Sequence, residues 1–336
     1  ASGILKEQGF YEYFYPFFNG SAVEGPAPTN GVTLGPVSTG SSAGIWQQAI
    51  ESEIIDPYGR QLESRNALEI PSASVYGYEF QLPIAMAQRA QHQNIAFDSF
   101  EDYEFVNVAN SPFDACTLPA HWRLPEGAAP IDAGANVARD PDLAHSGISA
   151  LRLEGETTIE RDIFSACDPG VRTIPSGTSY TIQDCDLIRN FAPTPGMYWL
   201  SAWVRESSGT PVLDTAYEKS AITVDLQFGG TTLSETFSAS GLLVDGWQQI
   251  NGMINIPDDP NLSRITVRLS NPTGDGWVSY FDDIRLQPYN AVMSTYVYDP
   301  VSLRLSAVLD ERNFATFYEY DDEGNVVAFI GEAAGE

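Results

Sequence analysis

Alternation of apolar and polar residues marks the middle of the chain as a set of half-buried β-strands. In residues 198–205, one face carries Tyr198, Leu200, Ala202 and Val204, and the opposite face carries Trp199, Ser201, Trp203 and Arg205. The same division recurs in residues 222–228 and 265–269. We expect the apolar faces to form a core and the opposite faces to lie outside it.

Both ends of the chain carry patterns typical of β-hairpins. Residues 54–63 read as a strand, a Pro-Tyr-Gly turn and a return strand, and residues 296–327 repeat this theme with aromatic strands. In the last turn, Gly324 can adopt a positive φ. Between these regions, Pro83 predicts the first turn of a short helix over residues 82–91. Residues 1–44 are an aromatic segment followed by a loop rich in Gly, Pro and Ser.

An acidic pair interrupts the apolar strand predicted for residues 277–286. Asp282 and Asp283 are adjacent, so strict alternation turns one carboxylate to solvent and the other inward. A buried carboxylate without a partner is too costly to keep. Calcium, which binds oxygen ligands, is one candidate partner. A solvated turn or a salt bridge to Arg285 or Arg268 is the alternative.

Six segments, taken in order, resemble the calcium-containing jelly-roll carbohydrate-binding modules. They are residues 97–103, Trp122, the His145-Ser146-Gly147 turn, and residues 198–204, 247–256 and 281–286. Those modules open on a Phe-Glu strand, carry a His-Ser-Gly turn and close on Asp-Asp-Val/Ile. The order of the segments carries the resemblance, which covers about residues 95–288. It implies an all-β fold, a jelly-roll β-sandwich.

In those modules, an acid of the first strand and an aspartate of the closing strand hold a structural calcium ion. The matching positions here are Glu101 and Asp283, and backbone oxygens of residues 146–149 are expected to complete the shell. The ion would join the two ends of the sandwich and would take no part in catalysis. The alternative is that both carboxylates are only solvated.

The C-terminal hairpins resemble tyrosine-aspartate (YD, Rhs-type) repeats over about residues 296–330, with a degenerate unit at residues 54–63. Tyr298-Asp299 and Tyr320-Asp321 carry this resemblance. A repeat unit cannot bury its own face alone and stacks on neighbours, so we expect further repeats of a parent protein beyond Glu336. The whole order is similar to parts of very large secreted surface proteins of Bacteroidota, which implies a secreted or cell-surface location.

The sequence thus predicts four parts. They are residues 1–44, a hairpin plus short helix at 45–94, the jelly-roll domain at 95–288, and YD-like hairpins at 289–336.

The charge balance limits the partners. Among 336 residues there are 17 Lys and Arg against 45 Asp and Glu, a net charge of −28. Nucleic acids and anionic membrane surfaces attract clustered positive charge, so neither is expected as a partner. No apolar run approaches the roughly 20 residues needed to span a bilayer.

The three cysteines match no zinc-binding pattern. Cys167 and Cys185 flank a loop rich in Pro, Gly, Ser and Thr. A disulfide between them would close this loop in an oxidising compartment. Cys116 is then left as a buried thiol.

A sugar surface is predicted on the outside of the sandwich. Trp199 and Trp203 stand about 13 Å apart along one strand, which suits solvent poorly unless something covers them. Neighbouring strands add Asp225, Gln227 and Arg268. Apolar sugar faces stack on aromatic rings, and sugar hydroxyls take polar partners. The alternative is that the hairpins or residues 154–195 pack over this face.

No catalytic residues are predicted, because His92, His121 and His145 match no triad and no phosphate loop or HExxH spacing occurs. Three functions compete: a non-catalytic extracellular module that is carbohydrate-binding or adhesive, a structural spacer within a YD-repeat surface protein, and a glycoside hydrolase with facing carboxylates. The ligands of a carbohydrate-binding module would be polysaccharides or cell-surface glycans. Exposure of Trp199 and Trp203 favours the first function, and their burial under the hairpins favours the second.

Overall fold

The computed structural model describes residues 8–14, 45–55, 59–78, 81–102, 135–155, 157–162, 170–173, 179–182, 191–207, 217–271 and 276–332. Within these ranges the regular elements are β-strands and two short 3-10 helices, η1 (His92–Asn94) and η3 (Pro141–Leu143). Neither helix is long and apolar enough to cross a membrane. The chain divides into two compact units, Ala1–Pro71 and Ser72–Glu336.

The described strands of the first unit form an antiparallel meander. They are β1 (Gln8–Phe14), β2 (Ile45–Ile55) and β3 (Gln61–Asn66). β2 and β3 are the hairpin predicted for residues 54–63, with Ile55 opposite Gln61. The prediction of this hairpin is confirmed.

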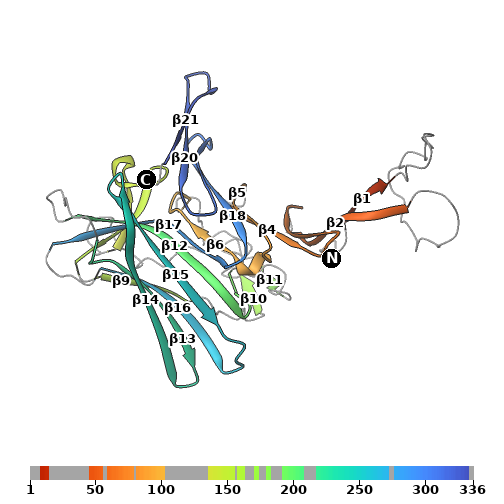
Figure 1. Cartoon of the computed structure of the whole chain (residues 1–336), viewed down its shortest axis with the longest axis horizontal. Helices are drawn as coiled ribbons and strands as arrows, with labels where there is room; N and C mark the ends of the chain where they lie inside the picture. The colour runs from red at the N-terminus through yellow and green to blue at the C-terminus, as the bar shows by residue number, and fades with distance from the viewer. Residues whose placement is uncertain are drawn as a thin grey trace. The chain divides into compact units, whose positions relative to one another are not determined.

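A second set of strands forms an antiparallel sheet, which we refer to as the hairpin sheet. Its order is β4-β5-β18-β19-β20-β21. The strands are β4 (Pro71–Gly77), β5 (Leu82–Gln88), β18 (Val292–Tyr298), β19 (Leu305–Leu309), β20 (Ala315–Tyr320) and β21 (Val326–Gly331). The predicted C-terminal hairpins are present, and β18 joins them to β5 from much earlier in the chain (Figure 1).

The short helix predicted for residues 82–91 is wrong. Residues 82–88 form β5, which lies between β4 and β18. Ala85 and Ala87 are buried in the apolar cluster of the hairpin sheet. Pairing with two strands satisfies the backbone N–H and C=O groups that a helix would bond internally. Tertiary pairing therefore overrides the helical preference of alanine.

Three turns of the hairpin sheet are built around an aspartate that follows a strand. The carboxylate accepts hydrogen bonds from backbone N–H groups of its own turn, and the aspartates are Asp299, Asp310 and Asp321. A residue with positive φ stands near the end of each turn: Leu303, Asn313 and Gly324. The positive φ predicted for Gly324 is confirmed.

The remaining large sheet folds into a sandwich of two layers joined by the long strand β14 (Thr231–Val244). The first part of β14 pairs with β13 and its last part pairs with β15. We name the first layer the β17 layer. It holds β7 (Ala135–Arg139), β8 (Ser149–Glu154), β17 (Val278–Pro288), β12 (Gly196–Ser207) and β15 (Trp247–Ile256). The short strand β6 (Ala96–Asp98) pairs with β17. The β13 layer holds β13 (Ala221–Phe228), β16 (Leu262–Asn271) and β9 (Thr157–Asp162).

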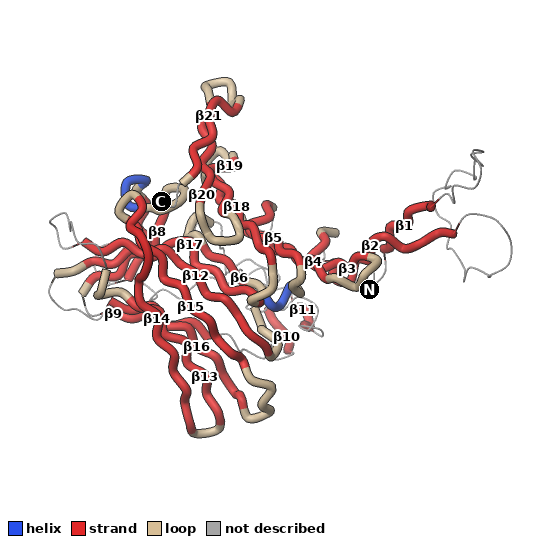
Figure 2. Tube along the Cα trace, viewed as in Figure 1, coloured by secondary structure: helices blue, strands red, loops and turns tan. Residues whose placement is uncertain are grey.

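Strands account for nearly all of the regular structure in the described residues (Figure 2). A separate two-stranded sheet consists of β10 (Gly170–Thr173) and β11 (Ser179–Ile182). The predicted all-β class, with a jelly-roll-type sandwich and flanking hairpins, is confirmed.

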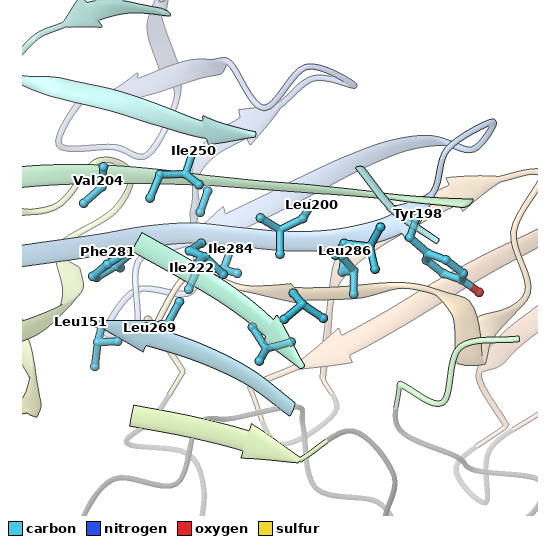
Figure 3. Close-up of a cluster of buried hydrophobic side chains, with 14 of the residues drawn as sticks. Leu151, Tyr198, Leu200, Val204, Ile222, Ile250, Leu269, Phe281, Ile284 and Leu286 are labelled. Carbon is cyan, nitrogen blue, oxygen red and sulfur yellow. The ribbon is translucent and has the colours of Figure 1, made fainter. Parts of the chain in front are cut away.

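The main core lies between the two layers (Figure 3). Its buried residues include the inward residues predicted from alternation in β12, β13 and β16: Tyr198, Leu200, Ala202, Val204, Ile222, Val224, Leu226, Ile265, Val267 and Leu269. Phe228, the remaining predicted inward residue of β13, is partly buried against this core. Burial of a large apolar side chain stabilises the fold by roughly 1.5–3 kcal/mol. The alternation therefore predicted which face of each strand points into the main core.

The hairpin sheet covers part of the outer face of the β17 layer. Arg285, on β17, is almost fully buried and donates hydrogen bonds to the carbonyl oxygens of Met293 and Asp310. Sandwich and hairpins thus belong to one compact unit. The predicted division of the chain into residues 1–44, 45–94, 95–288 and 289–336 stays a prediction.

Candidate functional site

The motifs that carried the family resemblance meet in a buried cluster on β17. Asp282 and Asp283 are both fully buried, and both contact the turn that begins at His145. One Asp282 oxygen accepts hydrogen bonds from the backbone N–H groups of His145 (2.8 Å) and Ser146 (3.2 Å). Asp283 accepts one from the Ser146 hydroxyl at 2.7 Å. The expectation that one of the two carboxylates faces solvent is wrong.

A β-bulge explains this arrangement. Ser201 of β12 pairs with Arg285, whereas Trp203 pairs with Asp282, so β17 holds one extra residue at this point. Asp283 has a φ of 47°, a left-handed conformation that non-glycine residues adopt at bulges and strained sites. The bulge breaks the alternation of side chains, which lets two neighbouring carboxylates reach the same turn.

Glu101 contacts the same turn. One of its carboxylate oxygens accepts hydrogen bonds from the backbone N–H groups of Ile148 and Ser149, both at 2.6 Å, and the other oxygen accepts the Ser149 hydroxyl at 3.2 Å. Gly147 has a φ of +70°, and a Cβ atom at this position would overlap the Glu101 carboxylate. The His-Ser-Gly turn therefore requires glycine both for its backbone and for the approach of Glu101.

His145 is held between two carboxylates. Its Nδ1 lies 2.7 Å from Asp283 Oδ2, and its Nε2 lies 2.9 Å from Glu332 Oε1. Two carboxylate acceptors require a proton on both ring nitrogens, so the ring is an imidazolium. Burial lowers the pKa of His145, but the hydrogen bonds and charges of Asp283 and Glu332 outweigh burial and raise it. The ring also stacks on Trp203 with 4.2 Å between centroids.

Burial changes the proton affinity of the acids in this cluster. It raises the pKa of Glu101 to about 8, against the hydrogen bonds from Ile148 and Ser149, and the charge of Asp283 adds to the rise. Burial, followed by the charges of Asp283 and Glu101, holds the pKa of Asp282 well above its usual value. Burial also lowers the pKa of Arg285 to about 10, which leaves this guanidinium charged at neutral pH.

The predicted calcium ligands Glu101 and Asp283 therefore share one cluster, but the turn offers them N–H and O–H donors where backbone oxygens were expected. Calcium takes six to eight oxygen ligands. In the described part of the chain, no group of three or more His, Cys, Asp or Glu side chains is placed to hold a metal ion. These contacts do not form a calcium shell by themselves, and calcium binding stays a prediction.

Trp203, one half of the predicted sugar platform, is buried with 1% of its surface exposed. The turn between β19 and β20 covers it. The indole N–H donates a hydrogen bond to the carbonyl oxygen of Asn313. Phe314 packs edge-on against the indole, with 5.5 Å between the ring centroids. The Asn313 amide also donates to the carbonyl oxygen of Asp283 at 2.9 Å. Trp203 as a sugar contact is wrong, because a hairpin turn occupies its outer face.

The outer surface of β12 is open nearer its first residues. Trp199 is partly exposed and pairs with Met253 of β15, which is 48% exposed. Asn251 and Asn255 flank Met253 on the same side of β15. Exposed Met197 precedes Trp199 on β12. We refer to these five residues as the Trp199 surface.

The other predicted ligand residues lie on the β13 layer. Asp225 of β13 is buried and pairs with Arg268 of β16 at 2.8 Å. Gln227 shares the outward side of β13, since the alternate residues of this strand face the core. These side chains and Trp199 point away from the core on opposite sides of the sandwich. The prediction that they form a single site is therefore wrong.

Cys116, Cys167 and Cys185 lie outside the described residues, so the disulfide between Cys167 and Cys185 stays a prediction.

No protein-family model and no curated protein matches this sequence. Similar solved structures include a family 16 carbohydrate-binding module, with 16% identity over 46% of this chain and 87% of that chain and a TM-score of 0.29. They also include the CBM22-2 xylan-binding domain of Paenibacillus barcinonensis Xyn10C, with 15% identity over 57% and 98% of the chains and a TM-score of 0.32. The structure of TmCBM61 in complex with β-1,4-galactotriose has 15% sequence identity to this chain and a TM-score of 0.25. The match covers 48% of this chain and 86% of that chain. Similarity at this level assigns neither a ligand nor a site, so the function is argued from this chain's own residues.

Proposed function

We propose that the protein is a non-catalytic carbohydrate-binding module whose ligand contacts the Trp199 surface. The observation that carries the proposal is a partly exposed tryptophan beside two exposed methionines, Met197 and Met253, on neighbouring strands. Apolar side chains exposed together mark contact surfaces, and an indole ring stacks on the apolar face of a sugar. Asn251 and Asn255 supply amide groups that can bond sugar hydroxyls.

The Trp199→Ala variant tests this proposal. Aromatic anchors dominate small interfaces, so glycan affinity should fall about tenfold or more with little change in melting temperature. Trp277→Ala is the matched control, because Trp277 is also partly exposed but lies outside the Trp199 surface. A glycan array identifies a ligand of the parent protein, and calorimetric titration compares the two variants. Equal loss of affinity in both variants would refute the assignment.

Burial of Trp203 under the hairpin turn favours a second candidate, a structural spacer of a larger surface protein. In this function the outer face of β12 serves to anchor the hairpins, and no ligand binds. Absence of glycan binding by the parent protein, together with a normal melting curve, would select the spacer over the binding module.

We also propose that β18 to β21 are YD-type repeats and that the module works in a secreted or cell-surface protein. The support is local: Asp299 and Asp321 follow Tyr298 and Tyr320 at the ends of β18 and β20, and each carboxylate caps the following turn. Polysaccharides or cell-surface glycans are then the ligand class. Antibody detection on intact cells and in the culture medium tests the location, and a purely intracellular signal would contradict it.

A further inference from the structure

An exposed tyrosine lies beside the Trp199 surface. Tyr289 follows β17 directly, and 61% of its surface is exposed. Its backbone N–H donates a hydrogen bond of 2.9 Å to the carbonyl oxygen of Met197 on β12. Trp199 pairs with Gln287, and Tyr289 lies two residues after Gln287, opposite Met197. Side chains two residues apart along a strand share a face, so Tyr289 lies on the same side of the β17 layer as Trp199.

Hydrogen bonds fix the turn that presents Tyr289. The backbone N–H of Ala291 donates to the carbonyl oxygen of Pro288 at 2.9 Å, and the Gln287 amide donates to the carbonyl oxygen of Ala291 at 3.2 Å. Gln287 and Ala291 are both buried. A side chain on a fixed backbone loses less conformational freedom when a ligand binds, and this favours affinity.

The spacing of the two aromatic side chains indicates the size of the ligand. Tyr289 stands diagonally from Trp199 across two neighbouring strands, and this relationship separates Cα atoms by about 7–8 Å. Side chains project roughly perpendicular to a sheet, so we expect the two rings to lie side by side. Each ring can then stack on the apolar face of a different sugar unit. A ligand that uses both rings therefore contains at least two linked sugar units.

The side chains around the two rings fit a sugar chain. Met197 and Met253 add exposed apolar surface. Asn251 and Asn255 carry amide groups, which both donate hydrogen bonds to hydroxyl groups and accept them. None of these four side chains is charged, so recognition uses stacking and hydrogen bonds and requires no ion pair.

We propose, on the basis of the proposed carbohydrate-binding function, that Tyr289 is a second sugar-stacking residue of this module and that the ligand is an oligosaccharide with two adjacent pyranose units on Trp199 and Tyr289.

A printed glycan array tests this on the full chain. The array carries each glycan as a length series from the monosaccharide to the hexasaccharide, and calorimetric titration with the members of a bound series gives the affinities. We expect members with two or more units to bind at least about tenfold more tightly than their monosaccharide. A monosaccharide that binds as tightly as the longer members of its series overturns the proposal.

Three variants locate the second ring. Tyr289→Ala should lower the affinity for the longer members about tenfold, whereas Tyr289→Phe keeps the ring and should bind like the parent protein. Phe329→Ala removes an exposed aromatic side chain from β21 and should also leave binding unchanged. All three changes are at exposed residues, so matching melting curves are expected and serve as the folding control.

The outcomes separate this proposal from the proposed function. Loss of affinity in Trp199→Ala but not in Tyr289→Ala overturns the role of Tyr289 and leaves the carbohydrate-binding module standing. Failure of the parent protein to bind any series overturns both. A dimer in sedimentation velocity that Tyr289→Ala abolishes and Phe329→Ala retains also overturns the proposal, because a second copy of the chain would then occupy this surface.

Discussion

The indole nitrogen of Trp203 and the backbone carbonyl of Asn313 are joined by a hydrogen bond of 2.6 Å. This bond connects β12 of the sandwich to a hairpin turn 110 residues later in the chain. The same turn bonds Gln249 of β15 through the carbonyl of Arg312. The tryptophan that would otherwise offer a ring to a ligand therefore anchors the hairpin sheet instead.

Trp199 and Trp203 should respond differently to truncation. Trp203→Ala opens a cavity between β12 and the hairpin turn, and removal of a buried aromatic side chain costs about 3–5 kcal/mol. Trp199→Ala should cost much less, because its ring is partly exposed. Urea unfolding of both variants gives the two free energies, and equal losses would contradict the different surroundings described for the two rings.

Asn313 should stabilise the contact between the sandwich and the hairpins. Asn313→Gly keeps a residue that tolerates the positive φ of 69° but removes the bonds to Ser201 and Asp283. Loss of buried hydrogen bonds of this kind costs about 1–3 kcal/mol. Asn313→Ala should cost more, since alanine also disfavours that backbone conformation. Thermal melting compares them, and a glycine variant as stable as the parent would remove the assigned role.

Glu101 should make the protein less stable as pH rises. Its pKa in the folded state is raised to about 8, so the folded state holds the proton more tightly than the unfolded state does. The free energy of unfolding then falls from about pH 5 to about pH 8 through this group. Glu101→Gln, a neutral side chain of the same shape, should remove this part of the slope. Chemical unfolding at several pH values measures the difference. If the free energy of unfolding of the parent protein instead rises relative to that of Glu101→Gln as pH rises, the cluster favours the charged carboxylate.

Calcium binding by Glu101 and Asp283 stays a prediction, and chelation tests it. A ligand that binds only the native state stabilises it by mass action, so excess EDTA should lower the melting temperature of the parent protein. Asp283→Ala should abolish the response to EDTA. A parent melting curve that EDTA leaves unchanged would exclude the ion and leave the cluster as a hydrogen-bond network.

Local pattern by itself determined several strands and which of their faces point into the main core. Alternation in residues 198–205 placed Tyr198, Leu200 and Val204 in the core, because neighbouring side chains of a strand point to opposite faces. Aspartate and glycine chemistry likewise predicted the turn at Gly324. The one helix predicted, at residues 82–91, failed because pairing with β18 is a contact between segments far apart in sequence.

Only the tertiary structure decided what covers each outer face. Nothing next to Trp203 in the sequence indicates that the Asn313 turn lies on it, and the bulge at Asp283 depends on pairing with β12. The sequence therefore named Asp283 as a chemistry-bearing residue but could not identify His145 as its partner, nor Glu332 as the second carboxylate that bonds this ring. Side-chain type and period are local properties, whereas burial of an outward face depends on which distant segment packs against it.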